Sequence, residues 1–264
     1  MRLSYVATGA LMTVRELMRN RLVLIMLFLI PSIFYTLVAL TTSDRPIAFK
    51  LASVSEDTFV SVSQKSESLI FIGVAAVGFL TSFVAMNLIR RDVEVNRRLV
   101  ICGYRPSELI VSKLTVLMGV ILVVALFVSL SLLLFFRPDR FALTAVGLIL
   151  AGWVYGAYGL LVGAIFRREL EAILFIVLLA NIDAGWLQNP IYYADAQNTE
   201  IIRALPAYFP SQISMVAAFS DHSVTVPIAA SVGYGLGLLF LALIVHRWRM
   251  PRVRHHGHLG DHDG

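Results

Sequence analysis

Charged residues and cysteine are scarce in this chain of 264 residues. Asp, Glu, Lys and Arg together make up 15%, well below the roughly 25% of soluble globular proteins, whereas apolar residues reach 58%. This composition excludes a disordered chain and argues against a soluble enzyme. The one cysteine, Cys102, excludes an intrachain disulfide and a cysteine-based zinc or iron–sulfur site.

Motifs for ATP hydrolysis and other catalysis are absent from the sequence. A phosphate-binding P-loop needs Gly-Lys followed by Ser or Thr, but the three lysines follow Phe49, Gln64 and Ser112. The sequence also has no His-Glu-x-x-His motif, no Gly-x-Ser-x-Gly motif and no cluster of carboxylates within an apolar run. We therefore expect no catalytic residues, no metal site and no cofactor bound by this chain. An ATP-driven process would need ATP and Mg²⁺ on a partner subunit.

The basic residues indicate a membrane surface rather than nucleic acid. The net charge is +5, and the bases stand in short clusters between long apolar runs. This pattern is typical of membrane proteins that face anionic lipid. Because arginine far outnumbers lysine, which suggests a GC-rich genome, we expect a multi-pass protein of the bacterial inner (plasma) membrane.

Six apolar runs are long enough to cross a bilayer, which takes about 20 residues. They are 22–42, 68–89, 114–136, 141–166, 170–187 and 224–245. The first is longer than the apolar core of a signal peptide, so we expect it to remain as a span. No segment between the runs is long enough for a soluble domain. The predicted fold is an all-α membrane protein with six transmembrane helices.

The distribution of Lys and Arg predicts the orientation. Segments 1–21, 90–113, 167–169 and 246–264 carry 16 of these residues, whereas 43–67, 137–140 and 188–223 carry 6. Cytoplasmic loops hold the excess of positive charge. Both termini are therefore expected in the cytoplasm.

The chain divides into an N-terminal helix, a membrane domain and a tail. Residues 1–21 have apolar positions at helical spacing, which predicts an amphipathic helix in the membrane interface, with a simply solvated helix as the alternative. Residues 22–247 form the six-span domain, whose outer loop 188–223 we expect to re-enter the outer leaflet as short helices. Residues 248–264 are His-rich, and we expect a disordered cytoplasmic tail rather than a metal site.

The loop 90–113, between the second and third spans, is too long for a simple turn. It has an apolar side, a basic side, a helix stop at Gly103 and a helix start at Pro106. Such a short helix across the cytoplasmic end of a bundle can receive force from a partner. It can equally anchor the neighbouring spans in the lipid interface, and the residues alone do not separate the two.

The plan of the chain resembles the ABC-2 type permeases, the membrane subunits of ABC exporters. The similarity lies in the N-terminal helix, the six spans, the basic loop ending in Gly103-Tyr104-Arg105-Pro106-Ser107-Glu108-Leu109, and the outer segment Leu205-Pro206-Ala207-Tyr208-Phe209-Pro210. The resemblance implies a permease that pairs with a second permease subunit, identical or different, and docks ATP-binding subunits through the loop 90–113. The polar residues that would contact the ATPase are Arg90, Arg91, Asp92, Glu94, Arg97, Arg98 and Glu108.

Two features inside the spans are further candidates. Gly152, Gly156, Gly159 and Gly163 share one helix face, which favours close helix packing within the chain, or else a transport path or subunit interface. Asn181 and Asp183 are polar residues in the fifth span and could line a substrate path. For Asp183 we favour a solvated residue near the outer surface.

We therefore expect the permease of an ABC exporter that moves a small amphipathic compound, such as a drug, antibiotic or lipid-like molecule. Export of polysaccharide or a lipid-linked compound stays open. An ATP-independent carrier would normally show internal repeats, and an intramembrane enzyme would need a convergent acid–base set. The sequence shows neither.

Overall fold

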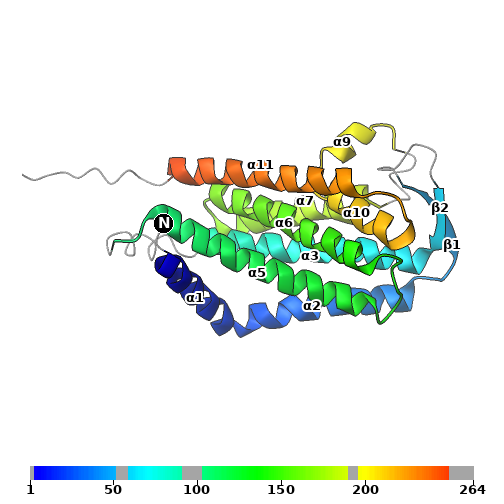
Figure 1. Cartoon of the computed structure of the whole chain (residues 1–264), viewed down its shortest axis with the longest axis horizontal. Helices are drawn as coiled ribbons and strands as arrows, with labels where there is room; N and C mark the ends of the chain where they lie inside the picture. Colours follow the sequence, from blue (N-terminus) through cyan, green and yellow to red (C-terminus); the bar gives the residue numbers. More distant parts are fainter. Residues whose placement is uncertain (1–2, 52–58, 91–102, 190–195, 250–264) are drawn as a thin grey trace, which may run out of the picture.

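The computed structural model describes residues 3–51, 59–90, 103–189 and 196–249. Within these residues, six helices are long and apolar enough to cross a membrane, which confirms the all-α membrane fold. They are α2 (Arg21–Thr41), α3 (Gln64–Arg90), α5 (Pro106–Leu132), α6 (Phe141–Ile165), α7 (Glu169–Ile182) extended by the π-helical turn η1 (Asp183–Leu187), and α11 (Thr225–Arg249). Figure 1 shows them lying side by side as one elongated bundle.

The N-terminal helix α1 (Leu3–Arg19) meets α2 at an angle, and Asn20 caps the start of α2. α1 packs along α5, where Gly9 lies so close to Ser112 that an added Cβ would be 3.0 Å from the hydroxyl oxygen. Leu11, Met12 and Met18 remain exposed. One face of α1 is therefore held by the bundle, and an apolar face is left for the lipid interface that the sequence predicts.

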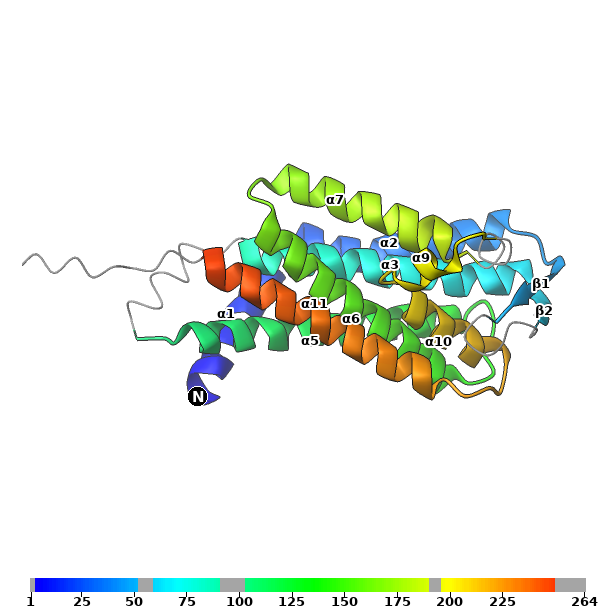
Figure 2. The same ribbon diagram turned by 90° about the horizontal axis from the view of Figure 1, so that it is seen from above.

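α3 and α6 form the centre of the bundle. In the most apolar window of each, 78% of the residues are buried, against 17% in α2 and α11. α5, α10 (Tyr208–Phe219) and α11 pack against α6, and α2 packs against α3. The peripheral helices thus enclose a central pair, which Figure 2 shows from a second direction.

The four glycines of the sequence pattern lie on the face of α6 that meets α3 and α5. A Cβ added at Gly159 would overlap the backbone carbonyl of Ser82, and one at Gly163 would be 3.0 Å from that of Met86. Gly152 and Gly156 are packed against Ile121 of α5. The Ser82 hydroxyl donates a hydrogen bond to the Tyr155 carbonyl oxygen at 2.8 Å. Within this chain, these glycines therefore serve close helix contact.

The third span differs from the predicted 114–136. α5 begins at Pro106, because proline is at the first helical position and the Glu108 side chain accepts a hydrogen bond from the Arg105 amide. α5 ends at Leu132. The next aromatic residues pack instead at the end of the bundle, where Phe136 stacks on Phe219 with ring centroids 5.8 Å apart.

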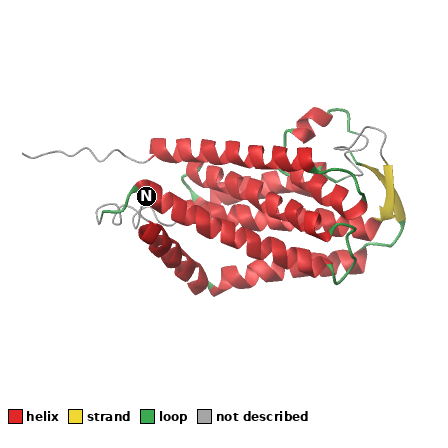
Figure 3. Ribbon diagram, viewed as in Figure 1, coloured by secondary structure: helices red, strands yellow, loops and turns green. Residues whose placement is uncertain are grey.

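The end of the bundle opposite α1, here called the β end, carries a hairpin that the sequence analysis did not foresee. β1 (Pro46–Lys50) pairs antiparallel with β2 (Phe59–Ser63), with Ile47 opposite Val62. Figure 3 shows these strands at the β end, away from α1. The buried Phe49 packs edge-on against Phe219, so the hairpin contacts the last residue of α10.

The described part of segment 188–223, which the sequence analysis expects on the outer side, contains two short helices. α9 (Thr199–Arg203) is one turn, and α10 (Tyr208–Phe219) is largely buried against α6 and α11. Gly147 of α6 lies so close to Ser214 that a Cβ would overlap its hydroxyl. The amides of Asp139 and Arg140 bond the last carbonyls of α10. α10 therefore packs among the helices of the bundle and does not lie across its end.

We predict that Gly159→Ala destabilises the protein by about 1–3 kcal/mol, because α3 and α6 must separate to admit the methyl group. Gly119→Ala is the matched control, since a Cβ at this exposed glycine of α5 meets nothing within 4 Å. Thermal unfolding of the purified variants in detergent measures both. Equal midpoints for the two variants would contradict the close α3–α6 contact.

Candidate functional site

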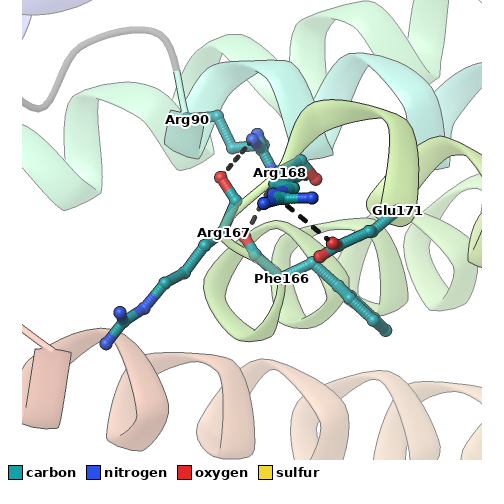
Figure 4. A network of polar contacts seen from close by, with 5 residues as sticks. All are labelled: Arg90, Phe166, Arg167, Arg168 and Glu171. Atoms are coloured by element: carbon teal, nitrogen blue, oxygen red, sulfur yellow. Dashed lines mark hydrogen bonds and ion pairs between the residues drawn. The ribbon is translucent and has the colours of Figure 1, made fainter.

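Arg90, the last residue of α3, forms hydrogen bonds with the turn between α6 and α7 (Figure 4). Its guanidinium donates hydrogen bonds to the carbonyl oxygens of Phe166 at 3.0 Å, Arg167 at 2.8 Å and Arg168 at 2.9 Å. Phe166 is the C-cap of α6, where helix carbonyls lack partners within the helix, whereas Arg168 is the N-cap of α7 and its carbonyl oxygen also accepts from the Ala172 amide. The planar guanidinium has the fork of donors that can serve several carbonyl oxygens together. We call this set of contacts the Arg90 clamp.

The clamp ties three spans at one point. Arg90 directly precedes residues 91–102, and its side chain links this end of α3 to the α6–α7 turn. On the far side, Arg168 pairs with Glu171 at 3.8 Å in the first turn of α7. The Arg167 side chain points away from the clamp in Figure 4, and this residue contributes its carbonyl.

The other end of the loop is also anchored. Glu108 is 1% exposed and accepts from the Arg105 amide at 3.1 Å, which closes the start of α5. The Lys113 ammonium donates to the Leu88 carbonyl oxygen of α3 at 2.8 Å. In this chain Glu108 therefore caps the start of α5, and its side chain is not on the surface where an ATPase could contact it. The remaining coupling candidates, Arg91, Asp92, Glu94, Arg97 and Arg98, lie outside the described residues.

Asp183 is fully buried, so the expectation of a solvated residue is wrong. Its carboxyl group accepts three hydrogen bonds: from the Tyr155 hydroxyl at 2.6 Å, the Gln188 side-chain amide at 2.9 Å and the Ala207 backbone amide at 2.8 Å. A buried carboxyl group is tolerated when its oxygens are satisfied in this way. Asp183 thus joins α6, α7 and the segment that leads into α10.

A local change of helix type places this carboxyl group. α7 passes at Asp183 into the π-helical turn η1 (Asp183–Leu187), where the Gln188 amide bonds the Asp183 carbonyl oxygen at 3.1 Å. The wider turn shifts the following residues, and such turns are frequent at functional sites. Asn181 lies before the turn, is exposed and bonds only the Val177 carbonyl oxygen of its own helix among the bonds described. The structure therefore does not bring Asn181 and Asp183 together.

Sequence reasoning missed the partners of Asp183. Tyr155 stands among apolar and glycine residues of α6, and a phenol in such a surrounding signals a need for a buried hydrogen-bond partner. Gln188 and Ala207 carry no comparable signal, since the π turn and the chain path that bring them close are not readable from residue types. No group of three or more His, Cys, Asp or Glu residues that could hold a metal exists within the described chain.

The family model described as ABC-2 family transporter protein matches residues 63–245. This match covers more than half of the chain. The chain belongs to the ABC-2 transporter family. The match begins at the end of β2 and runs to the last turns of α11, so both the Arg90 clamp and the Asp183 contacts lie inside it. No curated protein matches the chain significantly. Membership makes the chain a multi-pass ABC transport permease, which agrees with the six apolar helices.

We predict that Asp183→Asn destabilises this ABC-2 protein by about 1–3 kcal/mol. In asparagine, an NH₂ donor replaces one of the two carboxyl oxygens that accept hydrogen bonds from Tyr155, Gln188 and Ala207. The buried donor that faces this NH₂ group then loses its acceptor. Asn181→Ala, an exposed change on the same helix, should have little effect. Thermal unfolding in detergent measures both, and adding Tyr155→Phe to Asp183→Asn should cost less than the sum of the single changes. A fully stable Asp183→Asn protein would show that these hydrogen bonds contribute nothing.

Proposed function

We propose that this chain is the permease subunit of an ATP-driven exporter that moves a small amphipathic compound out of the cytoplasm. A separate ATP-binding subunit supplies ATP hydrolysis and holds ATP and Mg²⁺, since this sequence has no P-loop. The permease works as a dimer with an identical or related subunit in the bacterial inner membrane. Family membership supports an ABC transport permease, and the remaining points are our extension of it.

The Arg90 clamp is the observation that carries the proposal. The loop that the resemblance assigns to ATPase docking leads, at its first residue, into a side chain fixed to the α6–α7 turn. At its other end, Lys113 ties α5 to the last turns of α3. Movement of the loop therefore reaches α3, α5, α6 and α7 together. A plain lipid anchor between two spans would not need a link to α6 and α7.

The arrangement of the two ends favours export of a small compound. At the β end, α10 is packed within the bundle, Phe49 of the β1–β2 hairpin packs against Phe219 of α10, and Asp183 accepts a hydrogen bond from the segment before α10. The described residues include no separate outer domain that could receive a large polymer. This packed β end favours a small molecule that enters from the α1 end. It favours a polysaccharide or a lipid-linked compound less, because these are larger.

We predict that Arg90→Ala separates docking from coupling. The tagged permease should still co-purify with its P-loop partner, but substrate-stimulated ATP hydrolysis in liposomes should fall by about fivefold or more, because force no longer reaches the α6–α7 turn. Arg167→Ala is the matched control, since that residue contributes only its retained carbonyl group to the clamp. Unchanged stimulation in Arg90→Ala, or an equal fall in Arg167→Ala, would contradict transmission through the clamp.

Docking itself is tested by the double change Asp92→Lys and Glu94→Lys, which reverses charge on the loop. If the loop meets the ATPase, this change should abolish co-purification while leaving expression intact. Co-purification at the wild-type level would favour the lipid-anchor interpretation of the loop and return an ATP-independent carrier to consideration.

A further inference from the structure

The exposed surface of α1 has an apolar side and a basic side. The apolar side consists of four side chains that are 40–79% exposed and follow one another at helical spacing: Leu3, Leu11, Val14 and Met18. Arg15 and Arg19, one turn apart, are exposed on the adjacent side of the helix. The buried Val6 and Gly9 mark the side that the bundle holds. α1 therefore presents acyl-chain chemistry and positive charge next to each other.

The connection to α2 places α1 at the membrane surface. Asn20 is the one residue between α1 and α2, and α2 is among the helices long and apolar enough to cross a bilayer. In Figures 1 and 2, α1 is inclined to the bundle and does not continue the line of α2. A helix in this position can bury an apolar side among acyl chains and keep a basic side among head groups.

A hollow of about 160 Å³ adjoins the N-terminal half of α1. Ser4, Tyr5 and Thr8 of α1 line it together with Tyr104, and all four side chains carry a hydroxyl group. Thr8 precedes Arg15 by seven residues, about two helical turns, so the hollow and the arginine share one side of α1. Hydroxyl and guanidinium groups are hydrogen-bond donors that a phosphate group can accept from.

We propose that this surface of α1 binds anionic phospholipid of the cytoplasmic leaflet, with the phosphate at Arg15 and Arg19 and the polar head group toward the hollow. Residues 3–21 carry three arginines and one acid, Glu16, which suits an anionic leaflet. An acidic protein would match this charge but would leave the apolar side in water. The inference rests on the proposed function only for the side of the membrane on which α1 lies.

The same surface connects the lipid to the end of the loop 90–113. The Tyr5 ring packs edge-on against Tyr104, with ring centroids 4.8 Å apart. The close approach of Gly9 to Ser112 makes a second contact between α1 and this segment. A lipid that holds α1 at the leaflet therefore also holds the start of α5. In the proposed function, anionic lipid stabilises one end of the segment that meets the ATPase.

The experiment uses the full-length permease with a fluorophore on the apolar side of α1, at Ala7→Cys in a Cys102→Ser background. The protein is placed in phosphatidylcholine nanodiscs with the same small fraction of spin-labelled phosphatidylglycerol or spin-labelled phosphatidylcholine, whose nitroxide quenches the fluorophore on contact. We expect phosphatidylglycerol to give equal quenching at a mole fraction about threefold to fivefold lower, because bases near the head groups attract anionic lipid.

Variants identify the residues that carry the preference. Arg15→Gln with Arg19→Gln should abolish it, whereas Arg15→Lys with Arg19→Lys should retain it, since the charge is kept. Arg45→Gln, at an exposed arginine of the β end, is the matched control and should also retain it. In the wild-type protein, phosphatidylglycerol should slow amide hydrogen exchange at the start of α5, and in the double glutamine variant it should not.

Equal quenching by the two lipids, or a preference that survives in the double glutamine variant, would overturn the inference. Absence of quenching by either lipid would show a helix in water, and loss of the preference when glycerol phosphate is added would assign the site to a soluble phosphate. Unchanged exchange in α5 would contradict the connection to the loop. The assay contains no ATPase, so its failure leaves the exporter proposal intact. A lipid preference in a chain that never co-purifies with a P-loop subunit would refute the exporter and keep the lipid site.

Discussion

The close contact of α3 with α6 is the constraint on which the rest of this permease depends. Within a bilayer, lipid is as apolar as the side chains, so helices associate through van der Waals contact and hydrogen bonds rather than through the hydrophobic effect. Gly159 and Gly163 let the two backbones meet, and Ser82 adds a hydrogen bond across the contact. Because α5, α10 and α11 are placed by packing on α6, and α2 by packing on α3, a change in this pair would alter the whole bundle.

Polar contacts fix α7 to this pair at its two ends. At the α1 end the Arg90 clamp holds the turn before α7, and at the β end Asp183 accepts hydrogen bonds from α6 and from the segment before α10. The hydrogen bonds of Asp183 are buried, so they cost much when broken, because the groups left behind have no water to bind, whereas the bonds of Arg90 are partly exposed. α3, α6 and α7 are therefore linked by side-chain hydrogen bonds, and in the proposed function the force of a partner subunit would act on these three helices together.

The sequence predicted the features that depend on length and composition. The six spans follow from apolar runs, and the resemblance to the ABC-2 permeases follows from their order; the family match confirms it. The features that it could not predict depend on distant residues. The third span begins early because Pro106 and Glu108 form a helix start that outweighs the apolar pattern. Asp183 is buried because of a π turn and a partner from α6, neither of which is visible in local sequence.

The central claim is that the α1 end of the bundle, with the loop that follows Arg90, faces the cytoplasm and can meet an ATPase. The most direct test uses the one native cysteine, Cys102, in that loop. Treated with a membrane-impermeant maleimide, wild-type protein should react only after the cells are permeabilised. A cysteine at exposed Asn198, near the β end and introduced with Cys102→Ser, should react in intact cells. Labelling of Cys102 in intact cells, with Asn198→Cys protected, would reverse the orientation and contradict the account.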